Sequence, residues 1–207
     1  MRFNLGRTIV VGDIHGCYDE LVALLERARV GRDDRVVSVG DLVTKGEKNR
    51  DVLELFMSDE RFSAVVGNHD RARSCASLSV RRELEAGRAR YEAYLASLPY
   101  LIDLGSHVVV HAGLRPGVPL REQSPDDMTE LRTLGPDRRS REGVPWYAVY
   151  DGEQTALFGH WPAAELRRGP RALGLDTGCV YGYALTGYVV ETGELVSVPA
   201  LRRYSEG

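Results

Sequence analysis

Five short apolar runs, rich in β-branched residues, each end where a glycine stands beside Asp, Asn or His. Runs of this length that are bounded by turn residues are typical of β-strands. Their apolar residues are continuous rather than alternating, which indicates strands that are covered on both faces. The runs occupy residues 7–13, 34–41, 62–70, 107–113 and 155–160. The chain must therefore fold so that several buried strands carry polar side chains at their carboxyl ends.

Helical patterns separate the first three of these runs. In residues 18–29, apolar side chains recur with the i, i+3, i+4, i+7 spacing of an amphipathic helix. Residues 48–59 have a similar pattern. The resulting βαβαβ order predicts a layered α/β fold with right-handed crossover connections.

The remaining segments have weaker patterns. Residues 81–100 predict one helix that is closed by Pro99. A shorter helix is expected after Ser124, which could cap it, with Pro125 in its first turn. Residues 171–201 alternate short apolar runs with glycines and predict a meander of antiparallel strands.

Composition places the chain among soluble globular proteins. It has 207 residues, of which 43% are hydrophobic and 28% are charged. We expect one domain that spans residues 1–207. The net charge of −3 excludes an overall electrostatic signature of nucleic-acid or membrane binding. Local arginine clusters, such as DRRSRE at 137–142, are expected to form solvated surface.

Targeting signals and cysteine spacing indicate the cellular compartment that we expect for this protein. No run approaches the ~20 apolar residues of a membrane span, and the first residues do not form a signal peptide. Cys17, Cys75 and Cys179 are widely spaced and form no CxxC motif. We therefore expect reduced thiols in a cytoplasmic protein.

The polar residues at the strand ends form a coherent ligand set. In open α/β sheets, ligands bind outside the carboxyl ends of the strands, so these residues can converge on one site. Two Asp, an Asn carbonyl and three His are too many ligands for one tetrahedral zinc ion. They suit two divalent metals about 3.5–4 Å apart. A single Gly-Asp or Gly-Asn is usually a turn, but turn chemistry is a poor account of five such ends in one chain.

The motifs GDIHG, GDLVTKG, GNHD, HAG and FGHW resemble those of the calcineurin-like metallophosphoesterase superfamily, in its phosphoprotein-phosphatase-like branch. They extend over most of the chain, from about residue 8 to residue 180. PWYAVY and LDTGCVYG are most similar to bacterial diadenosine tetraphosphatases and ApaH-like phosphatases. The resemblance implies an α/β fold in which two mixed β-sheets form a sandwich flanked by helices.

The same resemblance implies roles for individual residues. The implied metal ligands are Asp13, His15, Asp41, Asn68, His111 and His160, with Asp41 bridging two divalent ions. Mn²⁺ is the first expectation for these ions, and Fe, Zn²⁺ and Co²⁺ are alternatives. His69 would be the general acid, and Asn68, Lys45 and Arg132 would bind substrate phosphate.

One position departs from the pattern of the family. Protein phosphatases of this branch usually carry an Asp-Arg pair where this chain has Thr44 and Lys45. A threonine cannot supply the negative charge that stabilises a protonated imidazole. This predicts a His69 that is less basic, or one that takes another partner such as Asp70 or Asp41. The alternatives are that Thr44 and Lys45 are ordinary loop residues, and that Arg132 belongs to the surface or caps the core.

Three functions remain open from the sequence. The first is a metal-dependent phosphohydrolase that cleaves phosphoanhydride or phosphoester bonds of dinucleoside polyphosphates or related 5′-polyphosphate compounds. The second is a phosphoprotein serine/threonine phosphatase, and the third is a metal-binding scaffold without turnover. The expected partners are accordingly a phosphorylated small molecule (a nucleotide or polyphosphate) or a phosphoprotein. Neither a membrane nor sequence-specific nucleic acid is expected.

Overall fold

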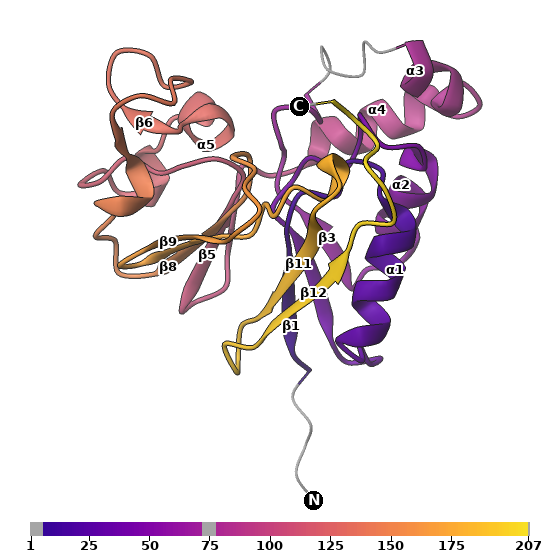
Figure 1. The fold of residues 1–207 in the computed structure, drawn as a ribbon, viewed down its shortest axis with the longest axis horizontal. Coiled ribbons are helices and arrows are strands. Elements are labelled where there is room, and N and C mark those ends of the chain that lie inside the picture. Colours follow the sequence, from indigo (N-terminus) through magenta and orange to yellow (C-terminus); the bar gives the residue numbers. More distant parts are fainter. Residues whose placement is uncertain (1–5, 72–77, 207) are drawn as a thin grey trace, which may run out of the picture.

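The computed structural model describes residues 6–71 and 78–206, and within them the chain forms two five-stranded sheets (Figure 1). The first sheet contains β1 (Thr8–Val11), β2 (Arg35–Ser38), β3 (Phe62–Ala64), β11 (Ala184–Val189) and β12 (Leu195–Pro199). Its order is β12-β11-β1-β2-β3. The strands β1, β2 and β3 are parallel, and β11 pairs antiparallel with both β1 and β12. The carboxyl ends of the first three strands therefore share one edge.

The second sheet is also mixed. It contains β4 (Leu101–Asp103), β5 (His107–Val110), β8 (Thr155–Phe158), β9 (Arg167–Gly169) and β10 (Ala172–Gly174). Its order is β4-β5-β8-β10-β9, in which β5, β8 and β10 are parallel. A separate hairpin pairs β6 (Thr133–Leu134) with β7 (Val144–Pro145). The five strands predicted to carry the site are thus divided between the two sheets.

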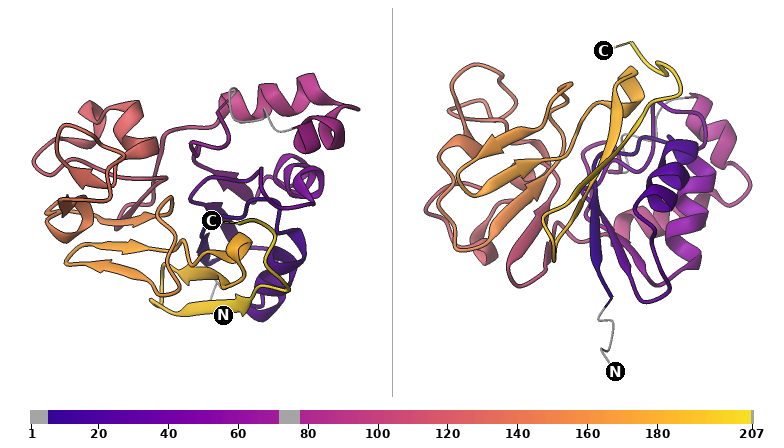
Figure 2. Two further views of the ribbon diagram at one scale, coloured as in Figure 1. Left: turned by 45° about the horizontal axis from the view of Figure 1, so that its top comes forward. Right: turned by 60° about the horizontal axis from the view of Figure 1, so that its bottom comes forward.

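Helices flank the sheets. The α-helices are α1 (Tyr18–Arg27), α2 (Asn49–Ser58), α3 (Leu78–Leu84), α4 (Arg88–Ser97) and α5 (Pro125–Glu130), and the 3₁₀ helices are η1 (Leu120–Glu122), η2 (Trp146–Ala148) and η3 (Cys179–Tyr181). Figures 1 and 2 show α1 and α2 on the outer side of the first sheet, with α3 and α4 beyond its end. None of the helices in residues 6–71 and 78–206 combines the length and apolar character that crossing a membrane requires.

Alternate residues of the central strands face different cores. Ile9 and Val11 pack into the cluster beneath the helices of the first sheet, whereas Val10 packs into a cluster between the sheets. In the second sheet, Val109 points to this same inner cluster, while its neighbours on β5 point outward. Both faces of these strands are apolar because both are covered, which explains the continuous apolar runs. The predicted sandwich of two mixed sheets flanked by helices is confirmed.

Several local predictions were wrong or incomplete. Residues 81–100 do not form one helix, because the chain breaks between α3 and α4, where Gly87 has a φ of +134°. Ser124 stands at the N-cap of α5, but its side chain makes no capping hydrogen bond. The C-terminal meander is divided, since β10 joins the second sheet while β11 and β12 pair antiparallel in the first.

Two of the three cysteines lie in the described residues. Cys17 and Cys179 are buried free thiols, and Cys75 lies outside the described residues.

An ion pair closes the start of β1 and gives the fold a testable acid dependence. Arg7 donates from Nη2 to Asp34 Oδ2 at 2.6 Å, and its backbone N–H donates to Asp34 Oδ1 at 2.7 Å. Burial acts to raise the pKa of Asp34, but the Arg7 hydrogen bonds and the Gly31 N–H lower it to about 2. A carboxylate with a depressed pKa stabilises the fold above its unfolded value, and this stability is lost as the pH falls.

We expect Asp34→Asn to lower the free energy of unfolding by about 2 kcal/mol at neutral pH. The difference from the wild type should shrink between pH 3.8 and about 2, where the wild-type carboxyl becomes protonated in the folded state. Urea unfolding at a series of pH values measures both effects. The matched control is Asp19→Asn, which breaks a half-exposed surface pair with Lys48. If the difference in free energy of unfolding between the wild type and Asp34→Asn did not change with pH, the depressed pKa of Asp34 would be contradicted.

Candidate functional site

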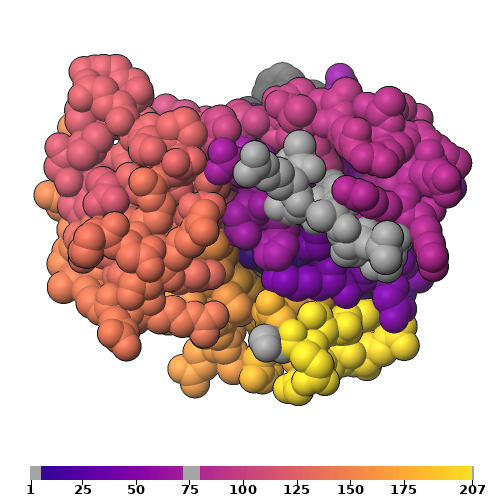
Figure 3. Space-filling view, turned by 90° about the horizontal axis from the view of Figure 1, so that it is seen from above, coloured from indigo at the N-terminus to yellow at the C-terminus, as the bar shows by residue number. Residues whose placement is uncertain are grey.

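The polar strand ends meet in one cavity between the two halves of the molecule. Every predicted site residue except His111 lines this cavity, and His111 lies fully buried beside it, in contact with Asn68. In the view of Figure 3, residues 115–150 form one side of the molecule, while the N-terminal half and the C-terminal residues form the other. The structure therefore brings together side chains that are up to 147 residues apart in the sequence.

Backbone hydrogen bonds join the loop after β1 to the loop after β2. His15 N donates to Asp41 O at 2.7 Å, and Gly16 N donates to Leu42 O at 2.9 Å. His15, Asp41 and His160 all have positive φ, of +48°, +53° and +67°. Residues other than glycine rarely adopt this conformation, and they do so mainly at functional sites where the surroundings hold them. The loops are thus held in a conformation that directs these side chains into the cavity.

Two glycines allow the carboxylates to approach the neighbouring loops. A Cβ at Gly67 would lie 2.1 Å from Asp41 Oδ1, and a Cβ at Gly159 would lie 1.9 Å from Asp13 Oδ1. Both distances are far too short for any side chain. Glycine is therefore required at these strand ends because a carboxylate passes directly over the backbone.

Asp41 lies at the centre of the cluster. Its Oδ1 accepts a hydrogen bond from the His69 backbone N–H at 2.8 Å and lies 3.5 Å from His111 Nε2. Its Oδ2 lies 3.4 Å from His15 Nε2. Burial acts to raise the pKa of Asp41, but the positive charge that the surrounding histidines carry when protonated, His111 first, and the charge of Lys45 hold it well below its usual range. Asp41 is therefore an ionised carboxylate with two oxygens that face different histidines.

The histidines around Asp41 are oriented by backbone carbonyls. His15 Nδ1 lies 3.1 Å from Val43 O, and His111 Nδ1 lies 2.9 Å from Val39 O. Because a carbonyl oxygen can only accept, these contacts place a proton on Nδ1 of each ring. The lone pair of Nε2 then faces Asp41. Burial lowers the pKa of both rings, that of His15 to about 3. Neutral imidazoles held in this way are the form that binds a metal ion.

His160 and Asn68 extend the cluster on the side of the second sheet. Asn68 Oδ1 lies 2.7 Å from His160 Nδ1 and 2.9 Å from His111 Nε2. The backbone N–H of His160 donates to Asp13 Oδ2 at 3.1 Å. Its Nε2 is buried and has no hydrogen-bond partner in the described residues. A buried ring nitrogen without a partner is costly, and a metal ion is one group that would satisfy it.

The acidic groups of the cavity require a cation. Asp13, His15 and Asp41 each offer a ligand atom, and these atoms lie within 4.8 Å of one another. Burial raises the pKa of Asp13 well above its usual range, and the charges of Asp176 and Asp41 raise it further. Several carboxylates that repel each other in a buried site are stabilised by divalent ions. The donor set of carboxylate oxygens, an amide oxygen and neutral imidazoles fits divalent metals.

Thr44 and Asp70 contact groups other than the His69 ring. Thr44 Oγ1 lies 3.4 Å from Nδ1 of His15 rather than beside His69. Asp70 also turns away, because its carboxylate accepts hydrogen bonds from the backbone N–H groups of Leu42, Val43 and Gly67.

The His69 ring packs edge-on against His15, with the ring centres 5.1 Å apart. In the described part of the chain it has no hydrogen-bonded carboxylate. Burial, the largest effect, lowers the pKa of His69, and the charge of Asp41 opposes this. The pKa is lowered in the direction expected from the sequence, but its largest cause is burial rather than the threonine at position 44.

Two basic side chains reach the cavity from different elements. Lys45 Nζ lies 3.2 Å from His15 Nε2 and 5.2 Å from the centre of the Tyr181 ring. Arg132 is half-buried, and its Nη1 donates to Arg139 O at 3.1 Å. Both residues therefore stand where they could contact a bound anion, which favours a site role for them over that of ordinary loop or surface residues.

Four further residues line the cavity and were not predicted from the sequence: Asp176, Tyr181, Arg141 and Pro162. Asp176 follows β10, the sixth strand that ends at the site, and its Oδ1 accepts a hydrogen bond from the Gly178 backbone N–H at 3.1 Å. Burial raises the pKa of Asp176 to about 6. Like Asp41, it follows a short apolar run close to glycine, here Gly174 and Gly178, each two residues away. Tyr181 and Arg141 belong to loops with no such signal.

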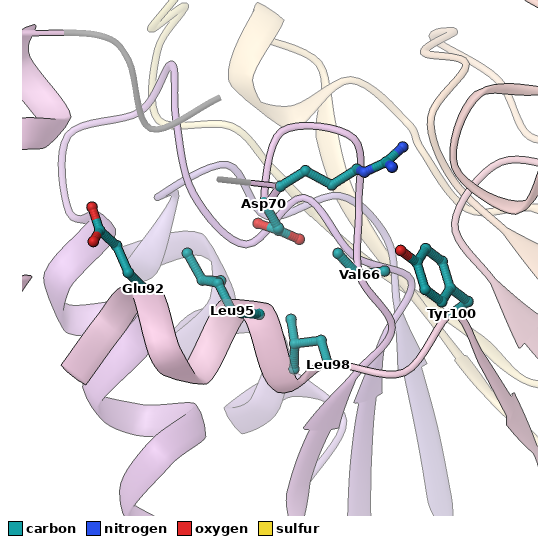
Figure 4. A pocket seen from close by; sticks show the side chains of 8 residues that line it. Val66, Asp70, Glu92, Leu95, Leu98 and Tyr100 are labelled. Carbon is teal, nitrogen blue, oxygen red and sulfur yellow. The ribbon is translucent and has the colours of Figure 1, made fainter. Parts of the chain in front are cut away.

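A second cavity, of about 210 Å³, lies behind the 67–70 turn (Figure 4). Its walls are formed partly by Val66, Leu95, Leu98 and Tyr100, and Asp70 lies over it. Among the described residues it contains none of the predicted metal ligands. The convergence of titratable groups therefore identifies the first cavity as the candidate site.

The sequence of this chain is similar to those of characterised phosphoesterases. Residues 6–189 match the family described as calcineurin-like phosphoesterase. The chain is 30% identical to a bis(5′-nucleosyl)-tetraphosphatase PrpE (asymmetrical) of Bacillus subtilis strain 168, over 95% of this chain and 96% of that protein. It is 28% identical to a symmetrical bis(5′-nucleosyl)-tetraphosphatase of Vibrio parahaemolyticus, over 94% of this chain and 99% of that protein.

Solved structures agree. A crystal structure of a candidate diadenosine tetraphosphatase superimposes with a TM-score of 0.82 at 35% identity, and covers 97% of this chain and 96% of that chain. A serine/threonine phosphatase of Saccharomyces cerevisiae superimposes with a TM-score of 0.71 at 16% identity, over 96% of this chain and 80% of that chain, and shows the shared fold. The protein is thus a member of the calcineurin-like phosphoesterase family, whose enzymes hydrolyse phosphate ester and anhydride bonds with divalent metal ions.

Proposed function

We propose that this protein hydrolyses a phosphoanhydride bond in dinucleoside polyphosphates or related 5′-polyphosphate compounds. The observation that carries this proposal is the buried cluster around Asp41, where carboxylates and neutral imidazoles from six strand ends converge. The names of the two bacterial relatives, both tetraphosphatases, support the choice of a nucleotide polyphosphate as substrate.

We propose that Asp13, His15, Asp41, Asn68, His111 and His160 hold two divalent ions, with Asp41 between them. The unpartnered Nε2 of His160 and the mutually repelling carboxylates support this assignment. Mn²⁺ is the first choice among the ions that such a donor set accepts, with Fe, Zn²⁺ and Co²⁺ as alternatives. When bound, such ions draw charge from phosphate oxygens and make water a stronger nucleophile near neutral pH.

The protein side chains would position the phosphoryl group and its leaving group. Lys45, Arg132 and the Asn68 amide would contact the oxygens on which charge is concentrated during transfer. His69 would donate a proton to the departing oxygen. Because a phosphate leaves more easily than an alkoxide, an anhydride requires a weaker acid than a phosphoserine does. A His69 without a hydrogen-bonded carboxylate is therefore better suited to nucleotide polyphosphates.

The second candidate is a phosphoprotein serine/threonine phosphatase. The fold shared with the yeast phosphatase favours it, although that similarity concerns the fold alone. The two candidates share the proposed metal cluster and differ in the walls around it, to which Arg132 and Arg141 of residues 115–148 contribute.

A substrate panel separates the candidates. Purified, Mn²⁺-loaded protein is incubated with diadenosine tetraphosphate, inorganic tripolyphosphate and a phosphoserine peptide, and the products are identified by chromatography. We expect turnover of diadenosine tetraphosphate to exceed that of the peptide by at least about tenfold in kcat/KM. Turnover of the phosphopeptide alone would overturn the proposal, and metal binding without hydrolysis of even p-nitrophenyl phosphate would favour a scaffold.

The acid role of His69 predicts a dependence on the leaving group. We expect His69→Ala to lower kcat by about 10²- to 10⁴-fold on phenyl phosphate, which has a poor leaving group, and by much less on p-nitrophenyl phosphate. The matched control is His107→Ala, because His107 packs on Tyr188 of β11 outside the cavity. Equal losses on both esters would show that His69 positions the substrate without donating a proton.

We further propose that residues 1–207 act as one domain and that the protein is cytoplasmic. The pairing of β1 with β11 supports the first statement because it joins the two ends of the chain in one sheet. The buried, free thiols of Cys17 and Cys179 support the second, since thiols stay reduced in the cytoplasm.

A further inference from the structure

Arg132 and Arg141 form a pair of cations on the wall of the cavity. Both line it together with Tyr181 of η3. Arg132 Nε is buried and makes no hydrogen bond to any residue that the structure describes. Burial, and next the charge of Arg141, lower the pKa of Arg132, so the two guanidinium groups are close enough to repel each other.

Other arginines of the same segment are neutralised by carboxylates. Arg115 Nε lies 2.6 Å from Asp127 Oδ2, and Arg139 Nη2 lies 2.7 Å from Glu130 Oε1. Over residues 6–71 and 78–206, no ion pair involves Arg132 or Arg141. The arginines of this segment that face the cavity are thus the ones left without a carboxylate, and an anion bound there would relieve their repulsion.

The backbone around Arg141 is held in place by a buried side chain. Thr133 is 1% exposed, and its Oγ1 lies 3.1 Å from Ser140 O and 3.0 Å from Glu142 O. The Glu142 N–H donates to Ser140 Oγ at 3.0 Å and closes a tight turn with Arg141 at its tip. Residues on both sides of Arg141 are therefore anchored to β6, and Arg132 immediately precedes that strand. The hairpin of β6 and β7 presents both guanidinium groups to the cavity.

We propose that Arg141, beside Arg132, forms a second anion subsite, which binds the phosphoryl group adjacent to the one that Arg132 contacts and that is hydrolysed. This inference rests on the proposed function and deepens it, because it makes a chain of at least two phosphates the recognised feature. A phosphomonoester has no second phosphoryl group to occupy the subsite. Arg141 therefore selects polyphosphates over monoesters, whether the chain belongs to a dinucleotide or to inorganic polyphosphate.

The test compares Arg141→Ala with Arg139→Ala on Mn²⁺-loaded enzyme. Arg139 is a suitable control because it lies in the same turn region, is exposed, and pairs with Glu130 away from the cavity. For Arg141→Ala we expect kcat/KM to fall by more than tenfold on diadenosine tetraphosphate and tripolyphosphate, mainly through KM. On p-nitrophenyl phosphate the fall should be less than threefold. Arg141→Lys should recover part of the loss, and the salt dependence of KM should weaken in Arg141→Ala.

The outcomes are distinct. Equal losses on polyphosphate and monoester, or no loss on either, would overturn the subsite. A loss confined to diadenosine tetraphosphate would show that Arg141 contacts the second nucleoside rather than a phosphate, which would also overturn it. If the wild type hydrolyses p-nitrophenyl phosphate but neither polyphosphate, the proposed function itself fails, independently of any variant. Near-identical thermal unfolding of the two variants would confirm that folding is not the cause.

Discussion

Asp41→Asn should abolish turnover on every substrate, with kcat/KM falling by at least about 10³-fold. The carboxylate lies between His15 and His111 and is 2% exposed, so its negative charge faces both sides of the cluster. An asparagine keeps the shape but removes the charge, and its amide nitrogen would face imidazoles or the His69 N–H. The metal content, measured by mass spectrometry, should fall below two ions per chain.

The control for this variant is Asp151→Asn, an exposed carboxylate outside the cavity. It should keep full activity and full metal content. Circular dichroism and thermal unfolding of the metal-free proteins establish that Asp41→Asn still folds. Wild-type activity in a folded Asp41→Asn variant would refute the bridging role and the cluster-centred mechanism with it.

Asp70→Ala should produce the largest loss of stability, about 3 kcal/mol in the free energy of unfolding. The Asp70 carboxylate is buried and accepts hydrogen bonds from Leu42 N at 2.9 Å, Val43 N at 3.3 Å and Gly67 N at 3.0 Å. Alanine would leave these buried amides without their protein acceptor. The same bonds join the loop after Asp41 to the 67–70 turn, so kcat should also fall by at least about tenfold.

Urea unfolding of the metal-free protein measures the stability of this variant. Asp70→Asn should lose less, because its amide oxygen can still accept hydrogen bonds. Asp103→Ala is the matched control: Asp103 also accepts a backbone N–H, from Gly105 at 2.8 Å, but at an exposed turn. Similar losses for Asp70→Ala and Asp103→Ala would contradict the view that Asp70 joins the two catalytic loops.

The convergence of the proposed ligands could be predicted because it depends on local sequence. Each strand is a short apolar run, and the residues that follow it emerge at the same edge as those of its parallel neighbours. Asp41 and Asn68, for example, need only the order of β2 and β3 to be placed together. Asp176 follows β10, which is parallel to β8, and therefore emerges at the same edge. The sequence pattern instead predicts an antiparallel meander for this segment, so it does not place Asp176 at the site.

The partners within the loops could not be predicted. Thr44 and Lys45 have φ values of +79° and +64°, and this conformation turns Thr44 towards His15 instead of His69. Arg141, in a cluster expected to be plain solvated surface, reaches the cavity because Thr133 holds its turn. No periodicity in the sequence encodes either contact.

The sequence by itself determined most of the strands that end at the site, their two-sided burial and the polar residues at their ends, because these depend on apolar spacing and on residues next to strand ends. Only the tertiary structure decided which side chains meet across the cavity, since that depends on how the two sheets pack and on the conformation of single loop residues. The same packing leaves Arg132 and Arg141 without carboxylate partners in the described chain, and it thereby creates the cationic wall that the chain order alone does not reveal.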